Sequence, residues 1–151
     1  MRALIQRVND ASVAIENKVK SKIGTGILVF LGIEESDNQE DISWLSNKIS
    51  QLRIFEDENG QMNHSVNDVN GEVMVISQFT LHAKTRKGTR PSYSRAAKPD
   101  TAIPLYEAFI EQMARDTSKE VQSGEFGAYM QIKLENDGPV TIMIDSKNKG
   151  L

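Results

Sequence analysis

The chain has 151 residues, of which 38% are hydrophobic and 26% are charged, with a net charge of −3. This composition is typical of a folded protein with a sizeable core, and the length suits one domain, which we place over residues 1–151. The absence of Cys excludes disulfides, thiolate metal sites and a Cys nucleophile, and it fits a reducing compartment. The opening MRALIQRVND lacks a signal-peptide core, and the longest apolar run, 27–31, is too short to span a bilayer, so we expect a cytoplasmic protein.

The first third of the chain is expected to be rich in strands. Alternation of side-chain type along Arg2–Val8 predicts an opening strand. Two short strands follow at 12–15 and 19–23, separated by turns. The continuous apolar run at 27–33 is typical of a strand that is buried on both faces.

A helix is predicted from about residue 38 to residue 52. Ser36 and Gln39 have the spacing of a capping box at its start. Apolar residues at steps of three and four form one stripe along it, namely Ile42, Leu45, Ile49 and Leu52.

The second half contains one strong strand, one helix and a β-rich end. The strand at 72–80 ends in the polar sequence Ser77-Gln78-Phe79-Thr80, and polar side chains at such a strand end are a common way to build a site on a rigid base. A second helix is predicted from about residue 104 to residue 115, because Pro104 suits a first helical turn. Further strands are expected at 53–55, 119–122, 128–135 and 140–144. This order predicts an α+β fold, with two main helices on one side of a mostly antiparallel sheet.

The stretch Asn136–Thr141 carries an unusual turn signal. Asp137-Gly138 between two strands ordinarily indicates a hairpin, because Gly accepts the positive φ that tight turns need. Pro139 directly afterwards gives no N–H to a ladder, so it belongs at a strand start, an edge or a bulge. The stretch is therefore either a plain hairpin turn or a backbone feature with a function.

Basic residues are concentrated in one loop. Six of the 18 Lys and Arg residues, and no acidic residue, lie between Lys84 and Lys98, so the remainder carries 12 basic against 21 acidic residues. The loop is either a solvated surface segment or a phosphate contact that draws a polyanion to one edge of an acidic body.

Side-chain chemistry offers few catalytic candidates. The only two His residues are His64 and His82. A nucleophile pair of His82 with Thr80 or Ser77 is one hypothesis, but no orienting third member and no Gly-x-Ser-x-Gly elbow accompanies it. The His residues lack metal-site spacing, so no metal or cofactor is predicted.

Motifs along the whole chain resemble those of the D-aminoacyl-tRNA deacylases, also called D-tyrosyl-tRNA deacylases. The two defining motifs are Ser77-Gln78-Phe79-Thr80-Leu81 and Asn136-Asp137-Gly138-Pro139-Val140-Thr141. In the same order the chain carries Met1-Arg2-Ala3-Leu4-Ile5-Gln6-Arg7-Val8, Phe55-x-Asp57-x-x-Gly60-x-Met62-Asn63, Lys87-Gly88-Thr89-Arg90-Pro91-Ser92-Tyr93, Leu105-Tyr106-Glu107-x-Phe109 and Gly124-x-Phe126-Gly127-Ala128. Tyr129 departs from the family pattern, which usually has Asp at this position.

The resemblance implies an enzyme that hydrolyses the ester between a D-amino acid and the terminal adenosine of tRNA, with glycyl-tRNA as a further substrate. It implies catalysis assisted by the 2′-hydroxyl of the substrate ribose rather than by a side-chain nucleophile. By carry-over the catalytic site is lined by Ser77, Gln78, Phe79 and Thr80. The adenosine is expected near Phe126, Gly127, Ala128 and Met130, and the tRNA contacts at Lys84, Lys87 and Arg90.

The resemblance also implies a homodimer with a barrel-like core. In this family the Gly138-Pro139 bond is cis and enters the active site of the partner subunit, where main-chain carbonyls exclude L-amino acids. Arg7 is expected to brace this segment across the dimer. The alternatives are a Thr80/His82 side-chain hydrolase and a non-catalytic tRNA-binding module.

Overall fold

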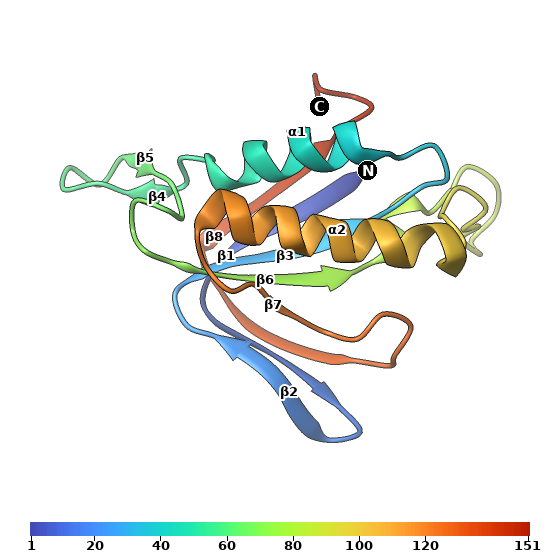
Figure 1. Cartoon of the computed structure of the whole chain (residues 1–151), viewed down its shortest axis with the longest axis horizontal. Coiled ribbons are helices and arrows are strands. Elements are labelled where there is room, and N and C mark those ends of the chain that lie inside the picture. The colour runs from blue at the N-terminus through green and yellow to red at the C-terminus, as the bar shows by residue number, and fades with distance from the viewer.

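The computed structural model describes residues 1–151. Two α-helices and a short 3₁₀ turn accompany eight strands (Figure 1). The strands are β1 (Arg2–Ile15), β2 (Lys18–Ile23), β3 (Gly26–Gly32), β4 (Phe55–Glu56), β5 (Met62–His64), β6 (Glu72–Ser77), β7 (Gln122–Ser123) and β8 (Gln131–Asp145). The helical elements are α1 (Gln39–Ser50), η1 (Phe79–His82) and α2 (Pro99–Thr117).

Strand β1 organises the main sheet. It pairs antiparallel with β3 through its first half, with β2 through its second half, and with β8 along almost its whole length. Strands β3, β6 and β7 then continue the sheet in parallel pairs. The prediction of a mostly antiparallel sheet is confirmed for the three pairings of β1, and the two parallel pairs make the sheet mixed.

The sheet curls until its two outer strands meet. The Ser21 hydroxyl in β2 donates to the Ser123 carbonyl in β7 at 2.7 Å, and the Lys20 ammonium donates to the Gly124 carbonyl at 2.5 Å. Side chains rather than a backbone ladder therefore join these strands, and the sheet is nearly closed into a barrel.

Helices α1 and α2 lie side by side against one face of the sheet (Figure 1). The larger core lies beneath them and includes Ile5 and Val29 from the sheet and Phe109 from α2. A smaller core fills the barrel-like half and includes Val13 and Met74. The predicted arrangement, with two main helices on one side, is confirmed. Neither helix combines the length and apolar character needed to cross a membrane.

The cap of α1 and the start of α2 differ from the sequence predictions, whereas α1 begins within one residue of the predicted start. The capping box of α1 is formed by Asn38 and Asp41, since the Asn38 side chain accepts from the Asp41 amide and the Asp41 carboxylate accepts from the Asn38 amide. The Ser36-based box is therefore wrong by two residues. Helix α2 begins at Pro99, where the missing N–H costs nothing, and Pro104 lies inside the helix rather than at its start.

Of the two readings of Asn136–Thr141, the plain hairpin turn is wrong. Residues 131–145 form one strand, β8, and both of its halves pair antiparallel with the same partner, β1. Val8 of β1 faces Asn136 and Gln6 faces Thr141, so residues 137–140 form a bulge in β8 opposite Arg7.

Candidate functional site

The predicted catalytic segment lies where β6 ends. Ser77 is the last residue of β6, and the chain turns at Gln78 into η1. The Gln78 amide donates to the Leu31 carbonyl at 2.7 Å, which holds the turn against the end of β3. A Cβ on Gly32 would lie 3.0 Å from the Gln78 carbonyl oxygen, so glycine there permits this close approach.

Two adjoining cavities share this segment as a common wall. Ser77, Gln78, Phe79 and Gly127 line both cavities. Phe126 lines the first cavity, and Ala128 and Met130 line the second. The structure thus brings Ser77, Gln78 and Phe79 beside the residues predicted for the adenosine, although the two groups are about 50 positions apart in sequence. Thr80, the fourth residue predicted for catalysis, lines neither cavity.

The loop that carries Phe126 is anchored from beneath. The Tyr106 hydroxyl donates to the Val75 carbonyl at 2.9 Å, and its ring packs 5.8 Å from the ring of Phe126. Burial raises the pKa of Tyr106 to about 12, so its hydroxyl stays a donor. A Cβ on Gly124 would collide with the Met130 sulfur, so glycine there lets the loop fold back on itself. Sequence reasoning missed this supporting role of Tyr106, although its family motif marked the residue.

The turn that follows Gln78 leaves two backbone amides available as hydrogen-bond donors. No side chain caps η1. The amides of Phe79 and Thr80 donate to no backbone carbonyl of a loop, turn or cap. Within the helical turn itself they also have no partner, because the first N–H groups of any helical turn lack one. Such donors suit a developing negative charge on an oxygen.

The Thr80–His82 pair does not form. The Thr80 hydroxyl accepts from the Gln78 side-chain amide at 2.6 Å, whereas neither ring nitrogen of His82 has a hydrogen-bond partner. His82 is 1% exposed, and burial lowers its pKa. Its Nδ1 lies 3.8 Å from a carboxylate oxygen of Glu34. No group of three or more His, Asp or Glu residues lies close enough to hold a metal ion.

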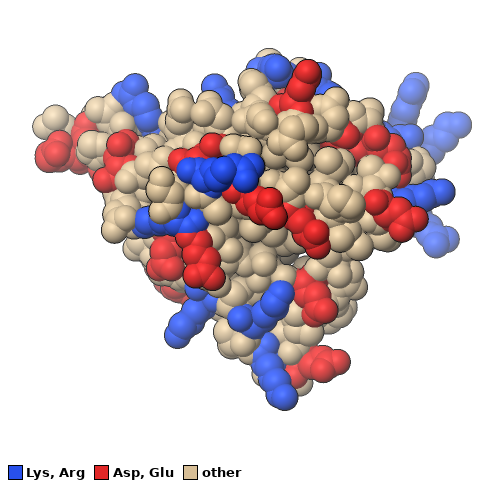
Figure 2. Space-filling view, in the orientation of Figure 1, with Lys and Arg blue, Asp and Glu red and all other residues tan.

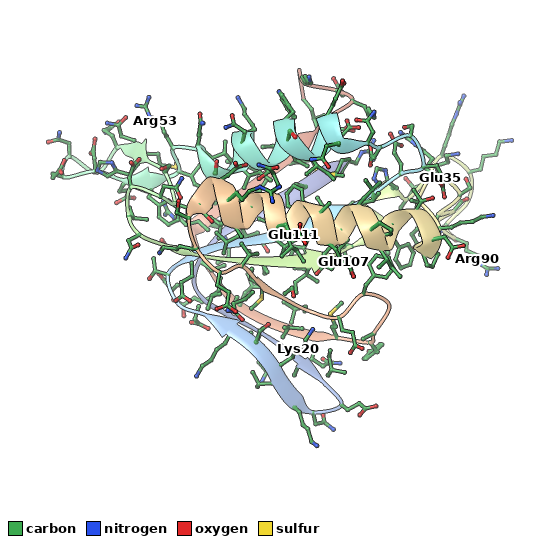
Figure 3. The ribbon with its side chains drawn as sticks, in the orientation of Figure 1. Lys20, Glu35, Arg53, Arg90, Glu107 and Glu111 are labelled. Carbon is green, nitrogen blue, oxygen red and sulfur yellow. The ribbon has the colours of Figure 1, made fainter.

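The basic loop stands beside the site as a cationic surface. Its base is closed by two backbone hydrogen bonds between Lys84 and Ser92, at 2.8 and 3.0 Å. A shallow cavity there has only cationic and hydroxyl side chains in its wall, namely Lys84, Arg86, Lys87, Arg90 and Ser92. Figure 2 shows the gathering of Lys and Arg at this end of the molecule, and Figure 3 shows Arg90 projecting into solvent there. Arg95, by contrast, is paired with Glu34 at 3.1 Å.

The Gly138-Pro139 segment protrudes from a different part of the molecule. Its peptide bond is cis, and both residues are exposed. The side chain of Asn136 takes the place of the backbone hydrogen bonds that are missing across the bulge. Its amide donates to the carbonyls of Arg7 and Val140, each at 3.0 Å. Sequence reasoning missed this role of Asn136.

Arg7 holds the bulge from within its own chain. The side chain is 6% exposed, donates to the Ile54 carbonyl at 2.6 Å, and lies 2.9 Å from a carboxylate oxygen of Asp137. Arg7 thus braces the bulge within its own chain, and the predicted contact of Arg7 across a dimer stays a prediction.

Strand β1 separates the bulge from the cavities. Arg2, at the start of β1, donates to the Leu81 carbonyl of η1 at 2.9 Å, whereas Arg7 contacts the bulge. Five residues of strand span about 16 Å, so the bulge does not line the cavities of its own chain.

Comparison with known proteins places the chain in a family. The family model described as D-Tyr-tRNA(Tyr) deacylase matches residues 4–145. The chain belongs to this family. It is 62% identical over 149 residues to a D-aminoacyl-tRNA deacylase of Parabacteroides distasonis and 60% identical to that of Flavobacterium psychrophilum, with 99% of each chain covered in both comparisons.

Two solved structures have the same fold as this deacylase-family chain. One is titled "c-Myc DNA Unwinding Element Binding Protein", with 40% identity, a TM-score of 0.90, and 96% of this chain and 98% of that chain covered. The other is described as a probable eukaryotic D-amino acid tRNA deacylase, with 18% identity, a TM-score of 0.83 and coverage of 95% and 97%, and it bears on the fold alone. The family resemblance inferred from the motifs is confirmed.

Proposed function

We propose that the protein hydrolyses the ester of D-aminoacyl-tRNA to release the D-amino acid and free tRNA. The observation that carries the proposal is the meeting of the Ser77–Phe79 segment with the Phe126–Met130 loop around shared cavities, in a chain of the deacylase family. An aminoacyl ester is already reactive, so a site without an activated side-chain nucleophile is sufficient. The enzyme acts in the cytoplasm, where tRNA is charged.

The chemistry needs orientation and charge stabilisation more than nucleophilic power. Water adds to the ester carbonyl, assisted by the substrate 2′-hydroxyl, and the tetrahedral intermediate expels the ribose oxygen. The amides of Phe79 and Thr80 donate to the oxyanion of that intermediate, and Ser77 and Gln78 line the wall beside it. Gln78 also fixes the hydroxyl of Thr80, which positions that residue rather than activating it.

Chirality is selected by the backbone of a second copy of the chain. Gly138 and Pro139 are exposed and lie about 16 Å along β1 from the end that contacts η1, so they reach a cavity only in a homodimer. Their carbonyl groups crowd the α-carbon of the substrate, and the side chain of an L-amino acid meets backbone while that of a D-amino acid points away. Glycyl-tRNA passes the same sieve, because glycine has no side chain to reject.

Lys84, Lys87 and Arg90 contact phosphates of the bound tRNA. These side chains are exposed, take no part in ion pairs, and line a cavity without an acidic residue. Phosphate contact releases counterions, so affinity for tRNA falls as salt rises.

The first experiment compares hydrolysis of D-Tyr-tRNA and L-Tyr-tRNA by the purified protein at low salt. Rapid loss of the D ester with the L ester spared supports the proposal, and Gly138→Ala then abolishes the activity. Equal hydrolysis of both esters contradicts the backbone sieve. Binding of tRNA without hydrolysis of either ester contradicts catalysis and leaves a nucleic-acid-binding module.

A second experiment tests whether the sieve acts between subunits. Gly138→Ala and Gln78→Ala, each inactive alone, are co-expressed with different tags, and the mixed dimer is purified. One complete site then forms from the cavity of one copy and the bulge of the other, which restores about half of the wild-type activity per dimer. A mixed dimer as inactive as its parents contradicts insertion between subunits.

A further inference from the structure

The exposed aromatic side chains of the protein gather at the mouth of the catalytic site. Only three of the nine Phe, Tyr and Trp residues are exposed: Phe79 at 54%, Tyr93 at 39% and Tyr129 at 84%. Phe79 lines both cavities, Tyr93 packs against Phe79, and Tyr129 lies between Ala128 and Met130 of the second cavity wall. Single exposed aromatic residues are common, but several exposed rings at one site are typical of a surface that binds a ligand.

The pair formed by Phe79 and Tyr93 presents a stacking surface. Their ring centroids are 5.0 Å apart and their planes meet at 78°, an edge-to-face contact. Such a contact fixes the orientation of Tyr93 while leaving ring surface exposed. Tyr129 has even less contact with the protein, so its ring contributes little to the stability of the fold.

The three exposed aromatic residues, Phe79, Tyr93 and Tyr129, form an aromatic rim. This rim is continuous along the chain with the cationic surface of the basic loop. Tyr93 directly follows Ser92, which lines the cavity of Lys84, Lys87 and Arg90. On the other side, Phe79 leads into the cavities at the end of β6. The cationic surface, the aromatic rings and the cavities therefore follow one another. Single-stranded RNA carries phosphates on one edge and flat bases on the other, so it fits this arrangement.

We propose that Tyr93 and Tyr129 stack on bases of the single-stranded segment that directly precedes the terminal adenosine of the substrate. The inference rests on the proposed function and extends it. The protein holds several nucleotides of the 3′ end, with their bases on the aromatic rim and their phosphates on the basic loop. Stacking is tolerant of sequence, so this subsite accepts the 3′ end of any tRNA. Tyr129 gives this chain a contact that an Asp at the same position could not provide.

The test compares two substrates that differ only in the nucleotides before the terminal one: D-tyrosyl-tRNA and D-tyrosyl-adenosine. The variants are Tyr93→Ala, Tyr129→Ala and the double variant. Tyr93→Phe and Tyr129→Phe keep an aromatic ring, and Met62→Ala, which removes a 55% exposed side chain on β5, is the remote control. Steady-state kcat and KM are measured at several salt concentrations, together with the unfolding midpoint.

Each alanine substitution is expected to raise KM for D-tyrosyl-tRNA by about fivefold or more, with kcat unchanged. For the alanine variants the KM for D-tyrosyl-adenosine rises much less than the KM for D-tyrosyl-tRNA, because this substrate lacks the preceding nucleotides. The phenylalanine variants and Met62→Ala match the wild type on both substrates. Because stacking involves no counterions, the slope of log KM against log salt stays that of the wild type, and the unfolding midpoint of Tyr129→Ala is unchanged.

Two results overturn the inference. One is an unchanged KM of the double variant for D-tyrosyl-tRNA. The other is an equal rise in KM for both substrates, which places the tyrosines at the terminal nucleoside or in the fold. Failure of the proposed function is a different result, because the wild type then cleaves neither D-tyrosyl-tRNA nor D-tyrosyl-adenosine.

Discussion

Replacing Arg7 by Met tests whether one buried cation holds the Gly138-Pro139 bulge. The Arg7 guanidinium joins two segments that are distant in sequence, because it donates to the Ile54 carbonyl at 2.6 Å and lies 2.9 Å from the Asp137 carboxylate. Met has a similar length and fills most of the same volume without charge or donors. The substitution thus removes both polar contacts while keeping much of the packing.

The two contacts have unequal weights. Ile54 is buried, and Arg7→Met leaves its carbonyl without a hydrogen-bond donor. An unsatisfied buried carbonyl costs about 1–3 kcal/mol. The Asp137 side chain is 44% exposed, so its pairing with Arg7 is screened by solvent and contributes about 1 kcal/mol at most. Arg7→Met should therefore lower the free energy of unfolding by about 1–4 kcal/mol, whereas Asp137→Asn should lower it by no more than about 1 kcal/mol.

The assay combines urea unfolding with the ratio of D-Tyr-tRNA to L-Tyr-tRNA hydrolysis. If Arg7 positions the bulge, Arg7→Met loses discrimination as L-Tyr-tRNA hydrolysis rises relative to D-Tyr-tRNA hydrolysis. A double-mutant cycle with Asp137→Asn separates the ion pair from the Ile54 contact, because the Ile54 contact cancels in the cycle and only the ion pair contributes to the coupling term. The reasoning is refuted if Arg7→Met matches the wild type in stability, or if it loses stability but discriminates as the wild type does.

Four further outcomes are expected. Gly138→Ala should lower stability by about 1–3 kcal/mol, since φ is +121° and the new Cβ would lie 2.9 Å from a methyl carbon of Val140, and urea unfolding measures it. His82→Gln should keep kcat within about threefold of the wild type at pH 7, because neither ring nitrogen bonds another group; a hundredfold loss would restore the side-chain hydrolase. Lys87→Ala should reduce the slope of log affinity for tRNA against log salt by about one, whereas an unchanged slope would remove Lys87 from the phosphate contacts. Burial raises the pKa of Asp145, but hydrogen bonds from Arg2 and the Lys147 amide outweigh this and hold that pKa below its usual value. The stability that Asp145 contributes is therefore complete above its unfolded pKa of about 3.9 and is lost as pH falls through the folded value, so Asp145→Asn should flatten the acid limb of a stability–pH curve.

Local patterns in the sequence predicted that both helices and the strands near 2–8, 19–23, 27–33 and 72–77 exist. They were wrong to end the first strand before residue 12, because β1 continues to Ile15, and they were insufficient for the C-terminal region. The Asp137-Gly138 signal states only that the backbone must depart from an extended path. A hairpin and a bulge use the same residues, and the choice depends on which strand lies alongside. Here β1 is long enough to pair with both halves of β8, an arrangement that no local window contains. Alternation over Arg2–Val8 was correct, in contrast, because the two faces of that strand meet different surroundings.

The Thr80–His82 hypothesis failed for a similar geometric reason. Residues two apart share a face only while the chain is a strand, and the chain leaves the strand after Ser77 to form η1. In the turn, the side chain of Thr80 meets Gln78 while that of His82 is buried. The residues around the cavities were identified by their family motifs rather than by periodicity, because a site built from backbone amides leaves little trace in side-chain composition.

The β1–β8 ladder fixes the positions of η1 and of the Gly138-Pro139 bulge, the two segments used in the proposed mechanism. At one end of β1, Arg2 pairs with Asp145 of β8 at 2.8 Å and holds η1 through the Leu81 carbonyl. Near its middle, Arg7 pairs with Asp137 of β8 and holds the bulge. Arg2 thus joins β8 to η1, Arg7 joins the bulge of β8 to β1, and the β1–β8 register sets the spacing between η1 and the bulge. In a two-fold homodimer the bulge of each copy must meet the cavity of the other, so this spacing has to match the distance across the dimer axis. A register shift of one residue would move the bulge by about 3.3 Å and turn it to the other face of the sheet. The proposed backbone sieve, which discriminates by one side-chain position, would not tolerate such a shift, so bracing both segments from a single strand is what that proposal requires.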